Sequence, residues 1–428
     1  MVKLLVIADD FTGALDTGVQ FRAQKSMVFV YKGDMQKLRK VFLEDLQVLI
    51  VDTESRHLDP KDAYNIVYSI VELALQLKIS YIYKKNDSGM RGNIGSELTA
   101  FWKATGSHSI HYIPAFPQMG RTTVNGIHYI NKVPVAESVF GKDPFEPVKK
   151  SSINEIIAEQ SNIPVLQGND QLDYVKKGIY VYDSQTQEDM QNLGKILKEK
   201  DQLHFVAGCA GFAGILFQLL EIKNHDEMLP FFVDKLLVIC GSINSVTIRQ
   251  LDKASENGFY RVALSPEQKL QPSWIKSKKG GLQIQKWKTE FQVHQNMIIE
   301  CGVKDEESTS QYMEKYKISL LDARHYIANV MGNILKELIS LGITSTILVT
   351  GGDTLMSFMD CINQSTIIPI CELIPGVVLS QFNYNCQTYN LISKSGGFGE
   401  DDLLLNLTNI IHNSSYSVRR NKENERRK

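Results

Sequence analysis

Two adjacent carboxylates near the start of the chain are the first residues whose types and spacing could do chemistry. Asp9 and Asp10 directly follow the apolar run Lys3–Ala8. Two carboxylates at the end of a strand can orient a substrate hydroxyl, hold Mg²⁺ through water, or cap the helix that follows. Since a single aspartate is enough for a cap, the pair favours a role in binding or catalysis.

A second group of polar residues lies in the ten-residue segment Lys84–Asn93. Arg91 can grip a carboxylate with two parallel hydrogen bonds, and Asp87 can accept a proton from a substrate hydroxyl. A solvated charged turn is the alternative interpretation. Such a turn does not require Gly89 and Gly92 on either side of an arginine, so we favour a functional segment.

A third candidate is Arg121, which follows the Pro- and Gly-containing segment Pro114–Gly120. It precedes Asn125-Gly126, a strong two-residue hairpin signal between β-prone residues. Arg121 can bind an anion there, or it can brace the hairpin by donating to carbonyl groups, and both interpretations stay open. His128 is predicted to pack within the hairpin rather than to act in catalysis.

Three glycine-containing loops occur in the C-terminal half, each between an apolar run and a helical segment. They are Gly241–Ser245, Gly351–Thr354 and Lys394–Asp402. Glycine lets the backbone approach phosphate oxygens, and the N-terminus of a following helix presents free N–H groups and partial positive charge. A single loop of this kind is also consistent with a tight turn, but three in one half predict a nucleotide bound through backbone amides.

Several nucleotide-binding signatures are missing from the sequence. There is no GxxxxGK[ST], HRD or DFG, so the chain is neither a P-loop kinase nor a protein kinase. The segment Gly208–Gly214 follows an apolar run but lacks GxGxxG spacing. We interpret it as close packing of a helix on a strand.

The elements that must position these residues alternate between strands and helices. Short apolar or β-branched runs end in small or acidic residues and lead into amphipathic segments. These runs are Lys3–Ala8, Val48–Val51, Tyr81–Tyr83, Phe205–Ala207, Leu236–Ile239 and Thr346–Val349. The alternation predicts an α/β fold of mostly parallel sheets flanked by helices. In such sheets ligands bind at the carboxyl ends of the strands, where the polar clusters fall.

The length of 428 residues exceeds a single ordinary core, so two domains are expected. The polar stretch Glu221–Met228, followed by Pro230, is the candidate linker. We therefore expect an N-terminal domain over residues 1–225 that carries the hairpin excursion, and a C-terminal domain over residues 230–415. Residues 416–428 are expected to form a disordered tail, because the segment Arg419–Lys428 is highly charged and lacks apolar side chains.

The composition is typical of a globular enzyme of the cytoplasm. Hydrophobic residues make up 43% and charged residues 22% of the chain, and the formal net charge is −1. This balance favours neither nucleic acid nor an anionic membrane as a partner, and no apolar segment is long enough to cross a bilayer. The six cysteines show no CxxC motif or zinc-site spacing, as expected for reduced thiols in the cytoplasm.

Taken in order, the motifs resemble those of the four-carbon acid sugar kinases. This family includes D-threonate 4-kinases, D-erythronate kinases and 3-oxo-tetronate 4-kinases. The resemblance covers nearly the whole chain, and it rests on Ala8–Phe21, Lys84–Asn93, Pro114–Tyr129, Ala207–Ala213, Gly241–Thr247, Gly351–Thr354, Pro375–Val377 and Ser393–Gly399.

The resemblance implies a sugar-acid-binding N-terminal domain and a nucleotide-binding C-terminal domain. It implies transfer of the γ-phosphoryl group of ATP, with Mg²⁺, to the terminal hydroxyl of a four-carbon sugar acid in carbohydrate catabolism. Matched residue by residue, the family's ATP-binding motifs fall on Ser242 or Ser245, on Gly351, Gly352, Asp353 and Thr354, and on Gly396 or Gly397.

For the N-terminal half, either Asp10 or Asp87 is the expected base that orients and deprotonates the substrate hydroxyl. The candidate substrate-binding residues are Asp9, Arg56, Lys85, Arg91, Gly92, Asn93 and Arg121. No residue is assigned as a metal ligand.

The chain departs from the family's pattern in two places. The family usually has Thr-Leu where this chain has Gly89-Met90, and often Cys-Ser where it has Ile243-Asn244. The first departure bears on the identity of the substrate, which is 3-oxo-tetronate, threonate or erythronate. The second bears on which serine contacts the nucleotide.

Two other functions are compatible with the loop chemistry alone. One is an NAD-dependent oxidoreductase of a sugar acid, for which Gly208–Gly214 is the sole candidate dinucleotide loop. The other is a non-catalytic sugar-acid sensor on the same fold. The sequence does not determine the oligomeric state, and a homodimer is the candidate that we consider.

Overall fold

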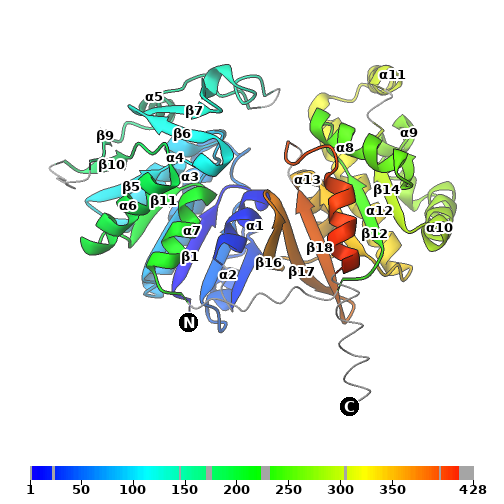
Figure 1. Ribbon diagram of the computed structural model, residues 1–428, viewed down its shortest axis with the longest axis horizontal. Helices are drawn as coiled ribbons and strands as arrows, with labels where there is room; N and C mark the ends of the chain where they lie inside the picture. Colours follow the sequence, from blue (N-terminus) through cyan, green and yellow to red (C-terminus); the bar gives the residue numbers. More distant parts are fainter. Residues whose placement is uncertain are drawn as a thin grey trace, which may run out of the picture. The chain divides into compact units, whose positions relative to one another are not determined.

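The computed structural model describes residues 2–21, 25–143, 146–169, 176–222, 232–302, 306–394 and 397–413. The chain forms two compact units, Met1–His225 and Asp226–Lys428, coloured blue to green and green to red in Figure 1. The expected tail, residues 416–428, lies outside the described residues, as does most of the expected linker before Pro230.

The first unit is an α/β structure built on a parallel sheet. Its sheet strands are β1 (Leu4–Ala8), β2 (Ser26–Val30), β3 (Val48–Asp52), β4 (Tyr81–Lys85), β5 (Ser109–Ile113), β9 (Val165–Gln167), β10 (Gly178–Val181) and β11 (Phe205–Gly208). They lie in the order β2-β3-β1-β4-β11-β5-β10-β9, and each neighbouring pair is parallel. Its helices are α1 (Phe11–Gln20), α2 (Met35–Phe42), α3 (Pro60–Gln76), α4 (Ile94–Thr105), α5 (Ile153–Ala158), α6 (Gln187–Glu199) and α7 (Ala210–Leu219), with 3-10 turns η1 (Pro117–Met119) and η2 (Val135–Glu137).

Burial explains why the strands of this sheet are nearly continuous apolar runs. Every residue of β1 and of β3 is buried, as expected when helices cover both faces of a parallel sheet. The helices start at polar caps: the Asp59 side chain accepts a hydrogen bond from the backbone N–H of Lys61 at the start of α3, where Pro60 occupies the first turn. The predicted α/β class is confirmed.

The predicted hairpin excursion is also confirmed. Strands β6 (Arg121–Val124) and β7 (Ile127–Ile130) pair antiparallel, and the short β8 (Val133–Pro134) follows. Asn125 and Gly126 both have positive φ, 51° and 70°, which is the geometry of a two-residue hairpin turn. The Asp183 carboxylate accepts hydrogen bonds from both of their backbone N–H groups, at 2.7 and 3.0 Å.

The second unit has a mixed sheet. Its strands are β12 (Leu236–Cys240), β13 (Tyr260–Ala263), β14 (Asn296–Glu300), β15 (Thr346–Thr350), β16 (Thr366–Ile374), β17 (Val377–Tyr384) and β18 (Gln387–Lys394). In the order β13-β14-β12-β15-β18-β17-β16, the first five are parallel and the last two pairings are antiparallel. Its helices are α8 (Ser245–Glu256), α9 (Pro266–Leu270), α10 (Lys278–Val293), α11 (Glu306–Tyr316), α12 (Leu320–Ser340) and α13 (Gly352–Cys361), with η3 (Trp274–Lys276) and a last helix over residues 403–413.

Among the strands of this sheet only β12 and β15 were predicted: β13 and β14 were not anticipated, and neither were the antiparallel strands β16 to β18. Tight turns join them: Gly376, with φ of 76°, lies between β16 and β17, and Asn385 and Cys386, with φ of 49° and 60°, lie between β17 and β18. Val377, Leu379 and Ile392 belong to the core of this unit together with the helix over residues 403–413. None of the described helices is both long enough and apolar enough to cross a membrane.

Candidate active site

The polar residues singled out in the N-terminal half gather at one edge of the first sheet. Ala8 is in register with Asp52 of β3 and with Lys85 of β4, and Lys85 is in register with Gly208 of β11. Because these strands are parallel, the residues that follow them emerge at the same edge. The residues brought together there include Asp9, Asp10, Arg56 and Asp87.

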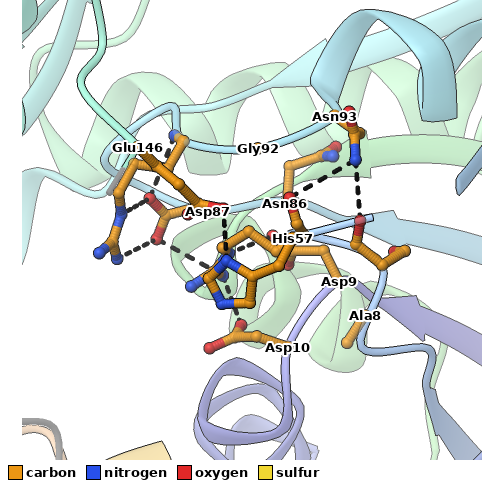
Figure 2. A network of polar contacts seen from close by, with 12 residues as sticks. Ala8, Asp9, Asp10, His57, Asn86, Asp87, Gly92, Asn93 and Glu146 are labelled. Atoms are coloured by element: carbon orange, nitrogen blue, oxygen red, sulfur yellow. Dashed lines mark hydrogen bonds and ion pairs between the residues drawn. The ribbon is translucent and has the colours of Figure 1, made fainter. Parts of the chain in front are cut away.

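Arg56 and Lys85 are the cations at the centre of this cluster. Arg56 donates from Nε to Asp9 Oδ2 at 2.9 Å and from Nη2 to Asp10 Oδ1 at 2.5 Å. The Lys85 ammonium lies 3.1 Å from Asp9 Oδ1 and 2.9 Å from Asp10 Oδ1. Figure 2 shows Asp9 and Asp10 in this network. Gly13 in α1 makes room for it, because a Cβ there would lie 1.7 Å from Lys85 Nζ.

Asp87 is held mainly by a different arginine. Arg91 donates from Nε to Asp87 Oδ2 at 2.8 Å and from Nη2 to Asp87 Oδ1 at 3.2 Å. A third contact runs from Arg91 Nη1 to Asp143 Oδ2 at 3.4 Å. Arg56 Nη2 lies 3.7 Å from Asp87 Oδ1 and so joins the two halves of the cluster. Both oxygens of Asp87 are therefore engaged by arginines.

The balance of burial and charge keeps two of the carboxylates ionised. Burial by itself would raise the pKa of Asp9, but the positive charges of Arg56 and Lys85 hold that pKa well below its ordinary value. Burial by itself would also raise the pKa of Asp87, but the positive charges of Arg91 and Arg56 have the larger effect and lower that pKa. Asp9 and Asp87 are thus fixed anions that orient cations.

Asp10 differs from its two neighbours in exposure and in hydrogen bonding. Its side chain is 19% exposed, against 2% for Asp9. Both cations reach the same oxygen, Oδ1, and no described residue donates a hydrogen bond to Oδ2. Figure 2 shows this second oxygen without a dashed line. Asp10 therefore has an oxygen with which it can accept a proton from a ligand.

Glu54 is a member of this site that the sequence analysis did not name. It follows β3 with a positive φ of 46°, which is strained for a residue with a side chain. Its Oε1 accepts a hydrogen bond from the backbone N–H of Phe11 at 2.9 Å, on the peptide group directly after Asp10. Burial, followed by the negative charge of Asp10, raises the pKa of Glu54 to about 7. The sequence did contain a signal for Glu54, because it belongs to the polar segment Asp52–Arg56 that follows the apolar run Val48–Val51. Only Arg56 of this segment was predicted to bind substrate.

A fully buried ion pair lies beneath the cluster and was also missed. Lys84 Nζ is 2.8 Å from Glu97 Oε2, and both side chains are fully buried. Glu97 also accepts hydrogen bonds from Asn86 Nδ2, at 3.1 Å, and from the hydroxyl of Ser55. The pair joins β4, the loop after β3 and α4. Nothing in the sequence marked Glu97 as a member of a buried ion pair, because a glutamate in the first turn of a helix is common.

Asn93 and Gly92, both expected to bind substrate, support the loop that carries Arg56. Asn93 Nδ2 donates to the carbonyl oxygens of Ser55 and Leu58 at 2.8 Å each, as Figure 2 shows in part. Gly92 packs on Arg56, since a Cβ there would lie 2.7 Å from Arg56 Cγ. In the structure Asn93 and Gly92 therefore position the loop that carries Arg56.

Arg121 was predicted either to bind an anion or to brace the hairpin. In the structure it makes a bracing contact, because its Nη1 donates to the carbonyl oxygen of Met119. Its guanidinium carbon also lies 5.9 Å from the centre of the Phe140 ring. Phe140 contacts Arg91 as well, with the Arg91 guanidinium carbon 5.1 Å from the ring centre. His128 is buried, as predicted, and its Nε2 lies 3.0 Å from the carbonyl oxygen of Ser88.

The glycine loops of the C-terminal half gather at one edge of the second sheet. Cys240, Thr350 and Lys394 are in register at the carboxyl ends of the neighbouring parallel strands β12, β15 and β18. The loops after β12 and β15 touch, because a Cβ on Gly241 would lie 2.0 Å from Thr354 Oγ1. Of the third loop, Gly397 lies near Asn244, whereas Gly396 is outside the described residues.

Gly351 and the first turn of α13 form the best-defined part of this edge. Gly351 precedes the helix with φ of 104°, which only glycine adopts without strain. Asp353, in the first turn, is held by Arg324 of α12, which donates from Nε at 2.5 Å and from Nη2 at 3.0 Å. This bidentate pair neutralises a carboxylate that would otherwise repel an anion at the N-terminus of α13.

The two candidate serines of the other loop are both accessible. Ser242 Oγ accepts a hydrogen bond from the backbone N–H of Asn244 at 3.3 Å, and Asn244 caps α8. Ser245, the first residue of α8, is exposed. Lys394, which begins the third loop and to which the sequence analysis gave no role, is buried and donates to Thr247 Oγ1 at 3.0 Å. Burial lowers the pKa of Lys394 to about 8.

Neither edge offers a protein-built metal site among the described residues. No group of three or more His, Cys, Asp and Glu side chains in that part of the chain could hold a metal ion. Asp9, Asp10 and Asp87 face arginine and lysine, which already compensate their charge.

Family models match both units of the chain. A model described as a sugar-binding N-terminal domain matches residues 4–216, and one described as a nucleotide-binding C-terminal domain matches residues 237–404. The curated relatives include a D-threonate kinase from Salmonella typhimurium, 28% identical over 94% of this chain and 97% of the relative. They also include a D-erythronate kinase from Heliobacterium modesticaldum, 30% identical over 60% of this chain and 61% of the relative.

Solved structures share the fold at low sequence identity. A Haemophilus influenzae protein is 19% identical with a TM-score of 0.69, covering 93% of this chain and 97% of the other. A Salmonella typhimurium protein described as a putative tRNA synthase is 18% identical with a TM-score of 0.73, covering 95% and 98%. At these identities the likeness concerns the fold alone.

A sugar-binding domain followed by a nucleotide-binding domain, in a chain whose curated relatives are named as kinases, makes this protein a phosphotransferase that acts on a hydroxyl group. The chain belongs to the four-carbon acid sugar kinase family. The oxidoreductase and sensor alternatives are therefore not retained.

Proposed function

We propose that this kinase uses ATP to phosphorylate the terminal hydroxyl of a four-carbon sugar acid, threonate, erythronate or 3-oxo-tetronate, in carbohydrate catabolism in the cytoplasm. The observation that carries the proposal is the cluster at the edge of the first sheet, where Asp10 keeps one oxygen open among cations. Relatives named D-threonate, D-erythronate and 3-oxo-tetronate kinase support this substrate class.

In this mechanism Asp10 is the base. Its Oδ2 accepts the proton of the terminal hydroxyl as the hydroxyl oxygen bonds to the γ-phosphorus and ADP leaves. Arg56 and Lys85 hold Oδ1 and so aim the other oxygen at the substrate. Asp9 and Asp87 keep Arg56, Lys85 and Arg91 in place; they are too fully engaged to take a proton.

Arg91 is the residue that best suits the carboxylate of the acid. A guanidinium has five N–H donors, and the side-chain contacts of Arg91 to Asp87 and Asp143 use three of them. The remaining two can bind a carboxylate in parallel. Arg121, which contacts the same Phe140 ring, adds a second positive charge at this end of the site.

ATP is assigned to the loops of the second unit. The backbone of Gly351, Gly352 and Thr354 and the N-terminus of α13 suit phosphate oxygens, and Asp353 is neutralised by Arg324. The other residues that we assign to ATP are one serine, Ser242 or Ser245, and one glycine, Gly396 or Gly397. Mg²⁺ that accompanies ATP neutralises phosphate charge when bound, and the described residues add no cluster of ligands for it.

A coupled assay of ADP release tests the proposal. The wild-type protein is supplied with ATP, Mg²⁺ and, in turn, D- and L-threonate, D-erythronate and 3-oxo-tetronate, with the three-carbon acid glycerate as control. We expect ADP release in many-fold excess over enzyme with at least one four-carbon acid and little with glycerate. If no four-carbon acid stimulates ADP release, the proposed function is wrong.

A further inference from the structure

One aromatic side chain contacts both arginines at the carboxylate end of the proposed acid site. The ring centre of Phe140 is 5.1 Å from the Arg91 guanidinium carbon and 5.9 Å from that of Arg121. Cations within about 6 Å of an aromatic ring face are attracted to it. Phe140 therefore contacts two positive groups that come from different segments of the chain.

Phe140 occupies its place because Gly89 has no side chain. A Cβ on Gly89 would lie 2.5 Å from Phe140 Cε1 and 2.6 Å from Cδ1, closer than real carbon atoms approach. Gly89 is not among the residues with positive φ, so its backbone does not require glycine. Space for the ring is the reason for glycine here, and this is the position where the family usually has threonine.

The surrounding backbone holds both partners in place. The Phe140 N–H donates to Ser138 Oγ at 3.2 Å, and the Phe140 carbonyl accepts from the N–H of Val148 at 3.0 Å. On the other side, the carbonyl of Ser88 lies 3.0 Å from Nε2 of the buried His128. These contacts fix the backbone on both sides of the place where the ring packs against Gly89.

We infer that Phe140, seated against Gly89, is a specificity-determining residue that sets the spacing of Arg91 and Arg121 and limits the acid to a short chain. This inference rests on the proposed function, since it takes the acid's carboxylate to bind at these arginines. A longer aldonic acid needs the space that the ring fills. Removal of the ring takes away the contact that the two arginines share and opens that space, so affinity for the short acid falls while longer acids gain access.

The first test compares wild type with Phe140→Ala and the milder Phe140→Leu in steady-state assays with four-, five- and six-carbon aldonic acids. We expect KM for the four-carbon acid to rise about tenfold with kcat changed less than about threefold, because Asp10 is untouched. The ratio of kcat/KM for the six-carbon acid to that for the four-carbon acid should rise about tenfold or more. Val139→Ala is the matched control, because its side chain is exposed and adjacent.

The second test is a double-mutant cycle between positions 89 and 140. Gly89→Ala alone should raise KM for the four-carbon acid, because the new methyl group displaces the ring. In the Phe140→Ala background the same substitution should have little further effect, because the clash is gone. Additive effects of the two substitutions would contradict the contact.

The outcomes separate this inference from the proposed function. If wild type phosphorylates none of the acids, the proposed function fails and the inference fails with it. If wild type phosphorylates a four-carbon acid, but folded Phe140→Ala and Phe140→Leu retain wild-type KM and chain-length ratio, the inference alone is overturned.

Discussion

At the scale of single residues, Asp9, Asp10 and Asp87 differ in how many of their oxygens the protein itself uses. Arginine and lysine engage both oxygens of Asp9 and of Asp87, whereas both cations at Asp10 meet Oδ1. Position in the sequence could not make this distinction, because all three carboxylates follow strands in similar polar segments. The hydrogen bonds favour Asp10 as the base.

We predict that Asp10→Asn lowers kcat by about a hundredfold or more with a small change in KM, because an amide cannot accept the hydroxyl proton. The measurement is ADP release with the best four-carbon acid. Asp201→Asn is the control, since Asp201 is exposed and its positive φ suits asparagine. Near-normal turnover by Asp10→Asn would remove Asp10 from the mechanism.

Glu54 leads to a prediction about pH and stability. Its pKa of about 7 in the folded protein lies above the ordinary value of 4.5, so the folded state binds the proton more tightly than the unfolded state does. The stability from this group is fully present below pH 4.5 and is lost as the pH rises through 7. The charged groups that act on Glu54 are Asp10, Arg56 and His57, and Glu54 in turn helps to raise the pKa of the buried Asp52.

Glu54→Gln keeps an acceptor for the Phe11 N–H and removes the ionisation. We therefore expect it to stabilise the protein at pH 8, by on the order of 2 kcal/mol, and to have a much smaller effect at pH 5. Thermal melts between pH 5 and 8 measure the difference, with the exposed Glu44→Gln as control. A Tm difference that does not vary with pH would contradict the raised pKa.

At the scale of elements, the buried pair of Lys84 and Glu97 fastens α4 to β4. We predict that Glu97→Ala lowers the free energy of unfolding by about 3 to 5 kcal/mol, because it leaves a buried ammonium without its carboxylate. Replacing both residues together, as Lys84→Met with Glu97→Leu, should restore much of the loss. Urea denaturation measures both, and a single variant as stable as wild type would show that the pair is dispensable.

The turn before α13 is the second element that can be tested. Gly351→Ala forces a side chain into φ of 104°, although the space around it is open to about 3.5 Å. We expect a loss of about 1 to 3 kcal/mol in stability and weaker thermal stabilisation by a non-hydrolysable ATP analogue. Gly281→Ala in α10 is the matched control, because nothing lies within 4 Å of its Cβ position and its φ is not positive.

At the scale of the whole molecule, the two units are assigned different ligands, and hydrogen exchange can test the division. A non-hydrolysable ATP analogue should protect amides near residues 241–247, 351–356 and 397–402. The four-carbon acid should protect residues 8–13, 53–58 and 85–93, since each ligand slows local opening where it binds. If the ATP analogue protected amides of the first unit alone, the assignment of ATP to the second unit would be wrong.

Local signals in the chain were enough to predict the architecture and the edges of the sheets where ligands bind. Apolar runs that end in small or acidic residues mark strands buried on both faces, and parallel strands bring their carboxyl ends to one edge. For this reason Asp9, Asp10, Arg56 and Asp87 could be grouped before their contacts were known. The antiparallel strands β16 and β17 were missed, although their β-branched residues and the Pro375-Gly376 turn between them are a local signal of paired strands.

The roles of individual side chains depended on contacts between residues far apart in the chain. Arg56 reaches Asp9 across 47 positions, and Lys394 reaches Thr247 across 147. Burial and neighbouring charge then set which carboxylate is locked and which oxygen is open, and neither quantity can be read from local sequence. The same holds for Phe140, because only the tertiary structure places its ring against Gly89 and within reach of two arginines.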